Sequence, residues 1–203
     1  GVDWVGVEGY MHIVLGMALA AAAGWNAFLA LLVLAFAHRL SSRIPIGPPY
    51  TFLSSNIGIL VLLLLLLPIE LFGDKAPRSE TINNRLGLIY RPVAGALIML
   101  ATTTGTGLPA VLAAIIGAAL ALGMHLLKVR YRRPLSGILS GLPSPAASAG
   151  EDFVVAVGAV AALLQPIAGL VIMALAALLA WWIGNFVRRK VQRDTAVATA
   201  PQT

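Results

Sequence analysis

Long apolar stretches with almost no charge constrain the fold of this chain more than any other feature. Hydrophobic residues make up 59% of the sequence and charged residues 11%, about half the charged fraction of an ordinary soluble protein. Runs such as the leucines at 62–67 do not suit a water-facing helix, because they would expose a large apolar surface. The sequence therefore predicts an all-α, polytopic integral membrane protein.

The apolar segments predict about six transmembrane helices. They lie at 10–38, 51–72, 87–103, 107–127, 152–165 and 166–187. A helix rises about 1.5 Å per residue and the hydrocarbon layer is about 30 Å thick, so the first segment is longer than one span requires. We expect it to be either tilted or broken near residues 24–26. The last two segments run together, and Gln165 followed by Pro166 is the expected place for the chain to turn back.

A nine-residue phrase occurs twice in the apolar sequence. RPVAGALIM at 91–99 returns as QPIAGLVIM at 165–173, with the proline, alanine, glycine, isoleucine and methionine identical. Each half holds three spans, which is an odd number, so a duplicated half must enter the membrane from the opposite side. The sequence thus predicts a single membrane domain over 1–187, built as an inverted 3+3 repeat with halves at about 10–103 and 107–187.

The basic residues predict an orientation. With six spans and a cytoplasmic N-terminus, eleven Lys and Arg residues near span ends lie on the cytoplasmic side, whereas Arg39 and Arg43 lie outside. We therefore expect both termini to be cytoplasmic in a bacterial inner membrane, with 188–203 as a basic C-terminal tail. The net charge of +6 sits mainly in short clusters at helix ends, which favours contact with membrane lipids, anionic ones included, over nucleic acid.

The residues that usually carry catalysis or hold metals are sparse. The chain has no cysteine, which excludes disulfides, thiolate catalysis and cysteine-ligated metals. The histidines His12, His38 and His125 lie on different segments without a ligand-like spacing, so we expect neither a metal nor a cofactor. Ser140 lies between Gly137 and Gly141 but has no arguable acid–base partner. We do not expect an enzyme.

Two sets of residues are candidates for function. Helix breakers inside spans can free backbone groups for binding, and an ionisable group at membrane depth costs about 3 kcal/mol, so it is a functional candidate by default. The candidate helix breaks are Gly24, Pro92, Gly95, Pro166 and Gly169. The candidates for binding a substrate or ion are Asn26, Glu70, Asp74, Lys75, Arg91, His125, Lys128, Glu151 and Asp152.

These candidates also have plainer structural interpretations. Pro92 and Pro166 can simply begin helices, with the nearby glycines allowing close packing. Asn26 can cross-link two helices, and the charges can form structural ion pairs. Glu151 follows Ser148 at the spacing of a capping box, so its carboxylate can cap the first amides of the fifth span.

Opposite charges at one depth are expected to meet. Asp74, Arg91 and Asp152 lie at the same predicted depth near the cytoplasmic ends of their spans. An uncompensated charge there would be costly, so we expect the three side chains to share one buried or half-buried polar cluster.

Several of these residues carry a resemblance to a known family. The phrases are GWN at 24–26, DKAP at 74–77, RPVAGA at 91–96, His125 with Lys128, and ED at 151–152. With them the chain resembles the bacterial domain-of-unknown-function family 4126 over about residues 15–185. The resemblance implies a small polytopic membrane protein and supplies no activity. Trp25 stands where the family leads us to expect a smaller aliphatic residue.

Two functions are compatible with these features. The first is a small inverted-repeat transporter or lipid-handling permease, in which a polar cavity between the halves opens alternately to the two membrane faces. The alternative is a non-catalytic accessory or scaffold subunit of a larger membrane complex. In either case we expect membrane lipids as partners, and a homo-oligomer or a larger complex as the assembly.

Overall fold

The computed structural model describes residues 4–65, 77–138 and 144–198, and over these ranges the chain is all-helical, with no strand. The elements are α1 (Trp4–Ala23), α2 (Ala27–Leu40), the 3-10 helix η1 (Tyr50–Ser54), α3 (Asn56–Leu65), α4 (Pro77–Thr103), α5 (Ala110–Ile138), α6 (Ser144–Leu164) and α7 (Pro166–Ala198). The prediction of an all-α fold is confirmed for these residues. Three candidate site residues, Glu70, Asp74 and Lys75, lie outside them.

Within the described ranges, four helices are long and apolar enough to cross a membrane. These candidate spans are Gly6–Ala23 in α1, Arg85–Thr103 in α4, Ala110–Tyr131 in α5 and Pro166–Lys190 in α7. Large apolar side chains also cover the outside of the bundle: Leu175, Leu178 and Trp182 of α7 are each more than half exposed. An apolar outer face of this kind is typical of a protein whose surroundings are lipid.

The first apolar segment is broken where the sequence predicts, at residues 24–26. α1 ends at Ala23, and α2 begins at Ala27 with Asn26 as its N-cap. The Asn26 side-chain oxygen accepts a hydrogen bond from the Leu29 amide at 2.9 Å, so it satisfies one of the amides that a helix start leaves free. We call residues 24–26 the apex.

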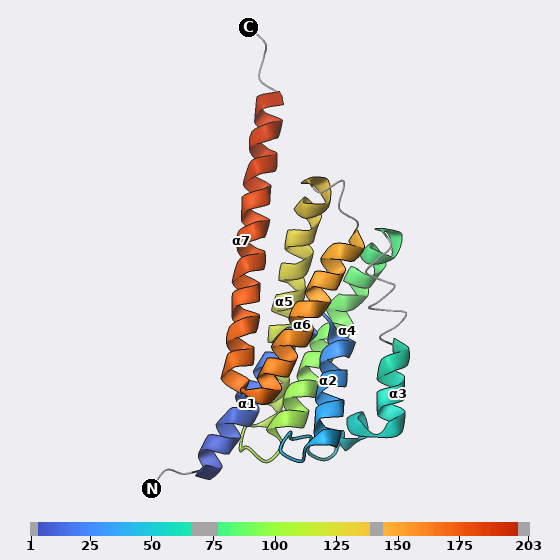
Figure 1. Ribbon diagram of the computed structural model, residues 1–203, viewed down its shortest axis with the longest axis vertical. Coiled ribbons are helices and arrows are strands. Elements are labelled where there is room, and N and C mark those ends of the chain that lie inside the picture. The colour runs from blue at the N-terminus through green and yellow to red at the C-terminus, as the bar shows by residue number, and fades with distance from the viewer. Residues whose placement is uncertain (1–3, 66–76, 139–143, 199–203) are drawn as a thin grey trace.

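The chain reverses direction at the apex (Figure 1). Gly9 in α1 lies against Thr106, in the turn between α4 and α5. Gly47, which follows α2, lies at the same end of the bundle, since its amide donates to the Ala101 carbonyl at 3.0 Å. The segment predicted as one tilted or broken span is therefore a hairpin that returns to the end from which it starts.

The hairpin changes the path that the sequence predicted for the chain. α1 begins at one end of the bundle and α7 ends at the other, whereas six single crossings would bring both to the same side (Figure 1). The expectation that both termini face the cytoplasm does not agree with this arrangement. The reason is that the apolar segment 10–38 contributes two helices and not one.

The predicted break between the last two apolar segments is confirmed. α6 ends at Leu164, α7 begins at Pro166, and the two helices pack side by side in opposite directions (Figure 1). Gly169 allows the close approach, because a Cβ added there would lie 2.4 Å from the Ala162 Cβ.

Both interpretations of Pro92, as a helix break and as a helix start, are wrong. It lies inside α4, which runs without interruption from Pro77 to Thr103. Proline is tolerated within membrane helices where neighbouring groups satisfy the freed backbone. α4 and α7 run in opposite directions, as an inverted repeat requires (Figure 1), but the two Pro-x-Ala-Gly phrases occupy different places in their helices. The six-helix 3+3 repeat stays a prediction.

Glycines bring α4 and α5 into backbone contact. A Cβ added to Gly95 would lie 2.3 Å from the Gly117 carbonyl oxygen, and one added to Gly117 would lie 2.2 Å from the Gly95 oxygen. Any side chain at either position would separate the helices. The close packing holds Arg91 of α4 beside His125 of α5, next to the apex.

Candidate functional site

The apex lies inside the bundle, between α4, α5 and α6. Trp25 and Asn26 are 5% and 1% exposed. Gly24 packs directly on α5, since a Cβ added to it would lie 2.4 Å from the Ala121 carbonyl oxygen. The ends of two helices leave backbone groups without intrahelical partners, and at this depth the partners must come from other helices.

Polar side chains gather around the apex from α2, α4, α5 and α6. We call them the apex cluster: Asn26, Arg91, His125, Lys128, Tyr131, Glu151 and Asp152. Apart from the half-buried Asp152, all are buried. Such a concentration of polar groups within apolar helices is the feature of the fold that most needs a functional explanation.

Two cations bind the carbonyl end of α1. Arg91 Nη1 donates to the Gly24 oxygen at 2.8 Å, and Lys128 Nζ donates to the Trp25 oxygen at 2.9 Å. The C-terminal end of a helix carries partial negative charge, so cations there are stabilising. The same two contacts satisfy carbonyls that the break leaves without helical amides.

An acid lies beside the amino end of α2. Asn26 Nδ2 donates to Asp152 Oδ1 at 2.8 Å, while the other side-chain atom of Asn26 caps the helix. The N-terminal end of a helix carries partial positive charge, which favours a nearby carboxylate. The two helix ends at the apex thus face side chains of opposite charge, cations at the end of α1 and Asp152 at the start of α2.

Glu151 completes a buried ion pair. Its Oε2 lies 3.1 Å from Lys128 Nζ, and its Oε1 accepts a hydrogen bond from the Tyr131 hydroxyl. A buried pair is tolerated when further hydrogen bonds satisfy its members, as they do here. The capping-box interpretation of Glu151 is wrong, because α6 begins at Ser144 and Glu151 lies well inside it.

Aromatic side chains pack next to the charged groups of the apex cluster. The Tyr90 hydroxyl accepts from Arg91 Nε at 3.2 Å, and the Arg91 guanidinium carbon lies 5.6 Å from the centre of the Tyr90 ring. Tyr90 in turn stacks on Phe28, with ring centres 5.4 Å apart. Trp25 and Tyr131 form a tilted pair with centres 6.2 Å apart. Tyr90 and Tyr131 thus contact charged side chains of the apex cluster directly.

A glycine makes room for the imidazole. A Cβ added to Gly87 would lie 2.8 Å from His125 Cε1 and 3.2 Å from Arg91 Nε. The imidazole and the guanidinium therefore both pack on the bare backbone of α4 at this point. His125 is fully buried and lies beside Arg91 at this point.

The structure brings together six of the predicted site residues: Asn26, Arg91, His125, Lys128, Glu151 and Asp152. Arg91 contacts Gly24 and Asp152 contacts Asn26. The cluster of these two residues with Asp74 stays a prediction, because Asp74 lies outside the described residues. In the part of the chain that the structure describes, no three His, Asp or Glu side chains form a metal-binding group.

Tyr131 was not among the predicted residues. A signal for it exists in the sequence, because it follows Lys128 by three positions and so shares a face of α5 with that residue. Basic residues on both sides of it predict contact with the membrane surface and not a buried position.

These features define a class: an all-helical protein with helices of membrane-spanning length and a buried, charged helix break. The chain belongs to the family described as Domain of unknown function (DUF4126), whose family model matches residues 13–185. All residues of the apex cluster fall within that match. No curated protein and no solved structure matches the chain.

Proposed function

We propose that this protein is a small membrane carrier, and that the apex cluster is the polar site through which its substrate or coupling ion passes. The observation that carries the proposal is the helix break itself. Its carbonyl end, its amide end and charged side chains from three other helices converge on one buried point. Transporters use interrupted helices in this way, because freed backbone groups can bind an ion or a polar substrate at depth.

The energetic cost supports a role beyond holding the fold together. Removing a charged group from water costs several kcal/mol even after relaxation, and the cluster contains three such groups, Arg91, Lys128 and Glu151, beside the half-buried Asp152. A continuous apolar helix through residues 24–26 would need none of them. A function in binding a polar ligand or transferring a proton would explain why the protein bears this free-energy cost.

The contacts suggest how a proton can be coupled to movement. A proton on Glu151 removes the negative charge that helps to position Lys128, and so weakens the restraint that Lys128 exerts on the Trp25 carbonyl. The end of α1 is then held less firmly, so the α1–α2 hairpin is freer to shift against α5 and α6. Proton binding thus biases the hairpin between two positions.

The orientation follows from the basic residues. Arg130, Arg188, Arg189 and Lys190 are exposed where α5 and α7 leave the apolar layer, at the end of the bundle away from Arg39 and Arg43. The more basic end faces the cytoplasm in a bacterial inner membrane. The end of α7 is then cytoplasmic, and α1 begins on the other side.

Site-directed labelling tests the carrier directly, because the chain has no native cysteine. Ala27→Cys and Val155→Cys place thiols beside Asn26 and Asp152, and each variant is reconstituted in proteoliposomes of a single orientation. A carrier exposes these positions in turn, so a membrane-impermeant maleimide should label each from both faces. Ser42→Cys and Arg189→Cys are surface controls, and each should label from one face, opposite to the other.

The scaffold function predicts a different result. It is favoured by the fact that Lys128 and Glu151 neutralise each other inside the protein. If the cluster only fastens the hairpin, the two apex thiols should resist labelling from both faces while the surface controls react. That outcome would refute the carrier.

A further inference from the structure

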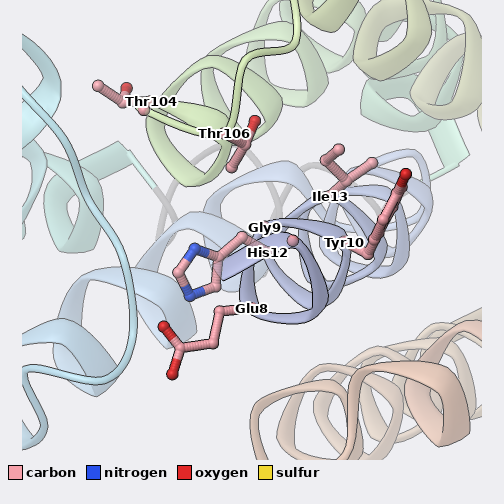
Figure 2. A pocket seen from close by; sticks show the side chains of 9 residues that line it. Glu8, Gly9, Tyr10, His12, Ile13, Thr104 and Thr106 are labelled. Atoms are coloured by element: carbon pink, nitrogen blue, oxygen red, sulfur yellow. The ribbon is translucent and has the colours of Figure 1, made fainter. Parts of the chain in front are cut away.

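A second polar hollow lies at the end of the bundle away from the apex cluster. It is a pocket of about 460 Å³ between the start of α1 and the turn that joins α4 to α5. Its lining residues include Glu8, Gly9, Tyr10, His12, Gly105 and Thr106. Figure 2 shows Glu8 and His12 on one wall and Thr104 and Thr106 on the other.

The pocket combines one acid with several neutral polar groups. Glu8 and His12 are four residues apart and so share a face of α1. Of the described residues that line the pocket, Glu8 alone carries a formal charge when His12 is neutral. The glycines leave backbone groups uncovered; at Gly105, with a φ of +82°, nothing lies within 4 Å of where a Cβ would be. The pocket should therefore favour a cationic or zwitterionic group over an anion.

The position of the pocket limits what can reach it. The candidate span of α1 begins at Gly6, so Glu8 and His12 lie in its first two turns, at the surface of the bilayer. Tyr10 is 71% exposed at the same level, where aromatic residues are commonly found. At this depth the most abundant polar molecules other than water are lipid headgroups.

We propose that this pocket binds the headgroup of a phosphatidylethanolamine-type lipid. Its primary ammonium donates hydrogen bonds to the Glu8 carboxylate, and its phosphate lies toward His12. A primary ammonium carries three N–H donors, whereas a choline headgroup carries none, so the carboxylate distinguishes the two. Anionic headgroups are disfavoured by the charge of Glu8. The proposal is independent of the carrier, because the pocket shares no residue with the apex cluster.

Calorimetric titration of the purified full chain in detergent micelles tests the proposal. Short-chain lipids are compared, namely dioctanoyl phosphatidylethanolamine, phosphatidylcholine and phosphatidylglycerol. The ethanolamine lipid should bind at least about tenfold more tightly than the other two, which corresponds to about 1.4 kcal/mol. Glu8→Gln should abolish this preference, since it keeps the shape of the side chain and removes the charge.

Two further variants separate the pocket from general effects on the fold. Gly9→Leu narrows the pocket while keeping Glu8 and His12, and should weaken ethanolamine-lipid binding by a similar factor. Ser42→Ala, an exposed change at the same end of the bundle, should leave the preference intact. Equal affinities for the three lipids, or a preference that survives Glu8→Gln, would overturn the proposal. Binding of soluble O-phosphoethanolamine as tightly as the lipid would overturn the assignment to a lipid.

Discussion

The two places where the chain reverses inside apolar sequence are built in different ways. At the apex, the break is buried and is held by side chains from α4, α5 and α6. At the turn between α6 and α7, Gln165 is exposed and its side-chain oxygen accepts from the Ile167 amide at 3.3 Å. Pro166 begins α7 and has no amide proton to satisfy. Residues distant in the sequence satisfy the free polar groups at the apex, whereas neighbouring residues satisfy those at the turn between α6 and α7.

Depth explains the difference. The 14 residues of α2 extend about 21 Å, and that length separates the apex from the end of the bundle at which α2 ends. Water cannot satisfy free backbone groups there, so protein groups must. Gln165 lies where α6 and α7 meet at the end of the bundle, and local hydrogen bonds suffice (Figure 1). A helix break at depth therefore ties together distant parts of the sequence, and a break at the surface does not.

The largest effect is expected from Lys128→Met. The change leaves the Glu151 carboxylate buried without its cation and removes the donor to the Trp25 carbonyl. Breaking a buried pair in this way should lower the free energy of unfolding by about 3–5 kcal/mol. Denaturant unfolding in detergent micelles, followed by tryptophan fluorescence, measures it.

A second substitution makes the test specific. Lys128→Met with Glu151→Gln removes both charges and should recover part of the loss. Lys190→Met, at an exposed position of α7, is the control and should change the stability by less than about 0.5 kcal/mol. A double variant no more stable than Lys128→Met would show that the pair is not coupled.

An intermediate effect is expected at the cap of α2. Asn26→Ala removes the acceptor for the Leu29 amide and the donor to Asp152, which should cost about 2 kcal/mol. Asn26→Asp keeps the cap but places two carboxylates together, so it should also destabilise at neutral pH. Exchanging the pair, as Asn26→Asp with Asp152→Asn, should restore much of the loss. Failure of the exchange to rescue would contradict the direct contact.

The smallest effect is expected at the surface break. Gln165→Ala removes one hydrogen bond at an exposed position, and water can replace it. The change in unfolding free energy should stay within about 0.5 kcal/mol. The same unfolding measurement applies. A loss as large as that of Asn26→Ala would remove the contrast between the two breaks.

The sequence predicted the breaks better than the path between them. Pro166 predicts the turn between α6 and α7, because proline disfavours a continuous helix. The length of segment 10–38 predicts the other break, because that segment is too long for one span. The count of basic residues, however, assumes that each apolar segment crosses once, and segment 10–38 returns to its starting side. Pro92 predicts a helix start or a helix break, but α4 continues through it.

The candidate site was predictable as a set of residues and not as a geometry. Arg91, His125, Lys128, Glu151 and Asp152 stand out because ionisable groups are rare in apolar segments. The sequence does not show which of these residues contact one another. Its capping-box spacing predicts that Glu151 caps the start of a helix, but α6 begins at Ser144 and Glu151 lies well inside it. Tyr131 was missed because a tyrosine near a span end is ordinarily explained by the membrane surface.

The sequence by itself determined the helical, membrane-type character of the chain, its two breaks and most of the polar residues of the apex cluster. These follow from hydropathy and from the chemistry of proline, glycine and asparagine, which act over a few neighbouring residues. Only the tertiary structure decided that the chain turns back at the apex and which side chain holds which helix end. Lys128 and Trp25 are 103 positions apart and Asn26 and Asp152 are 126 apart, so those contacts depend on how whole helices pack.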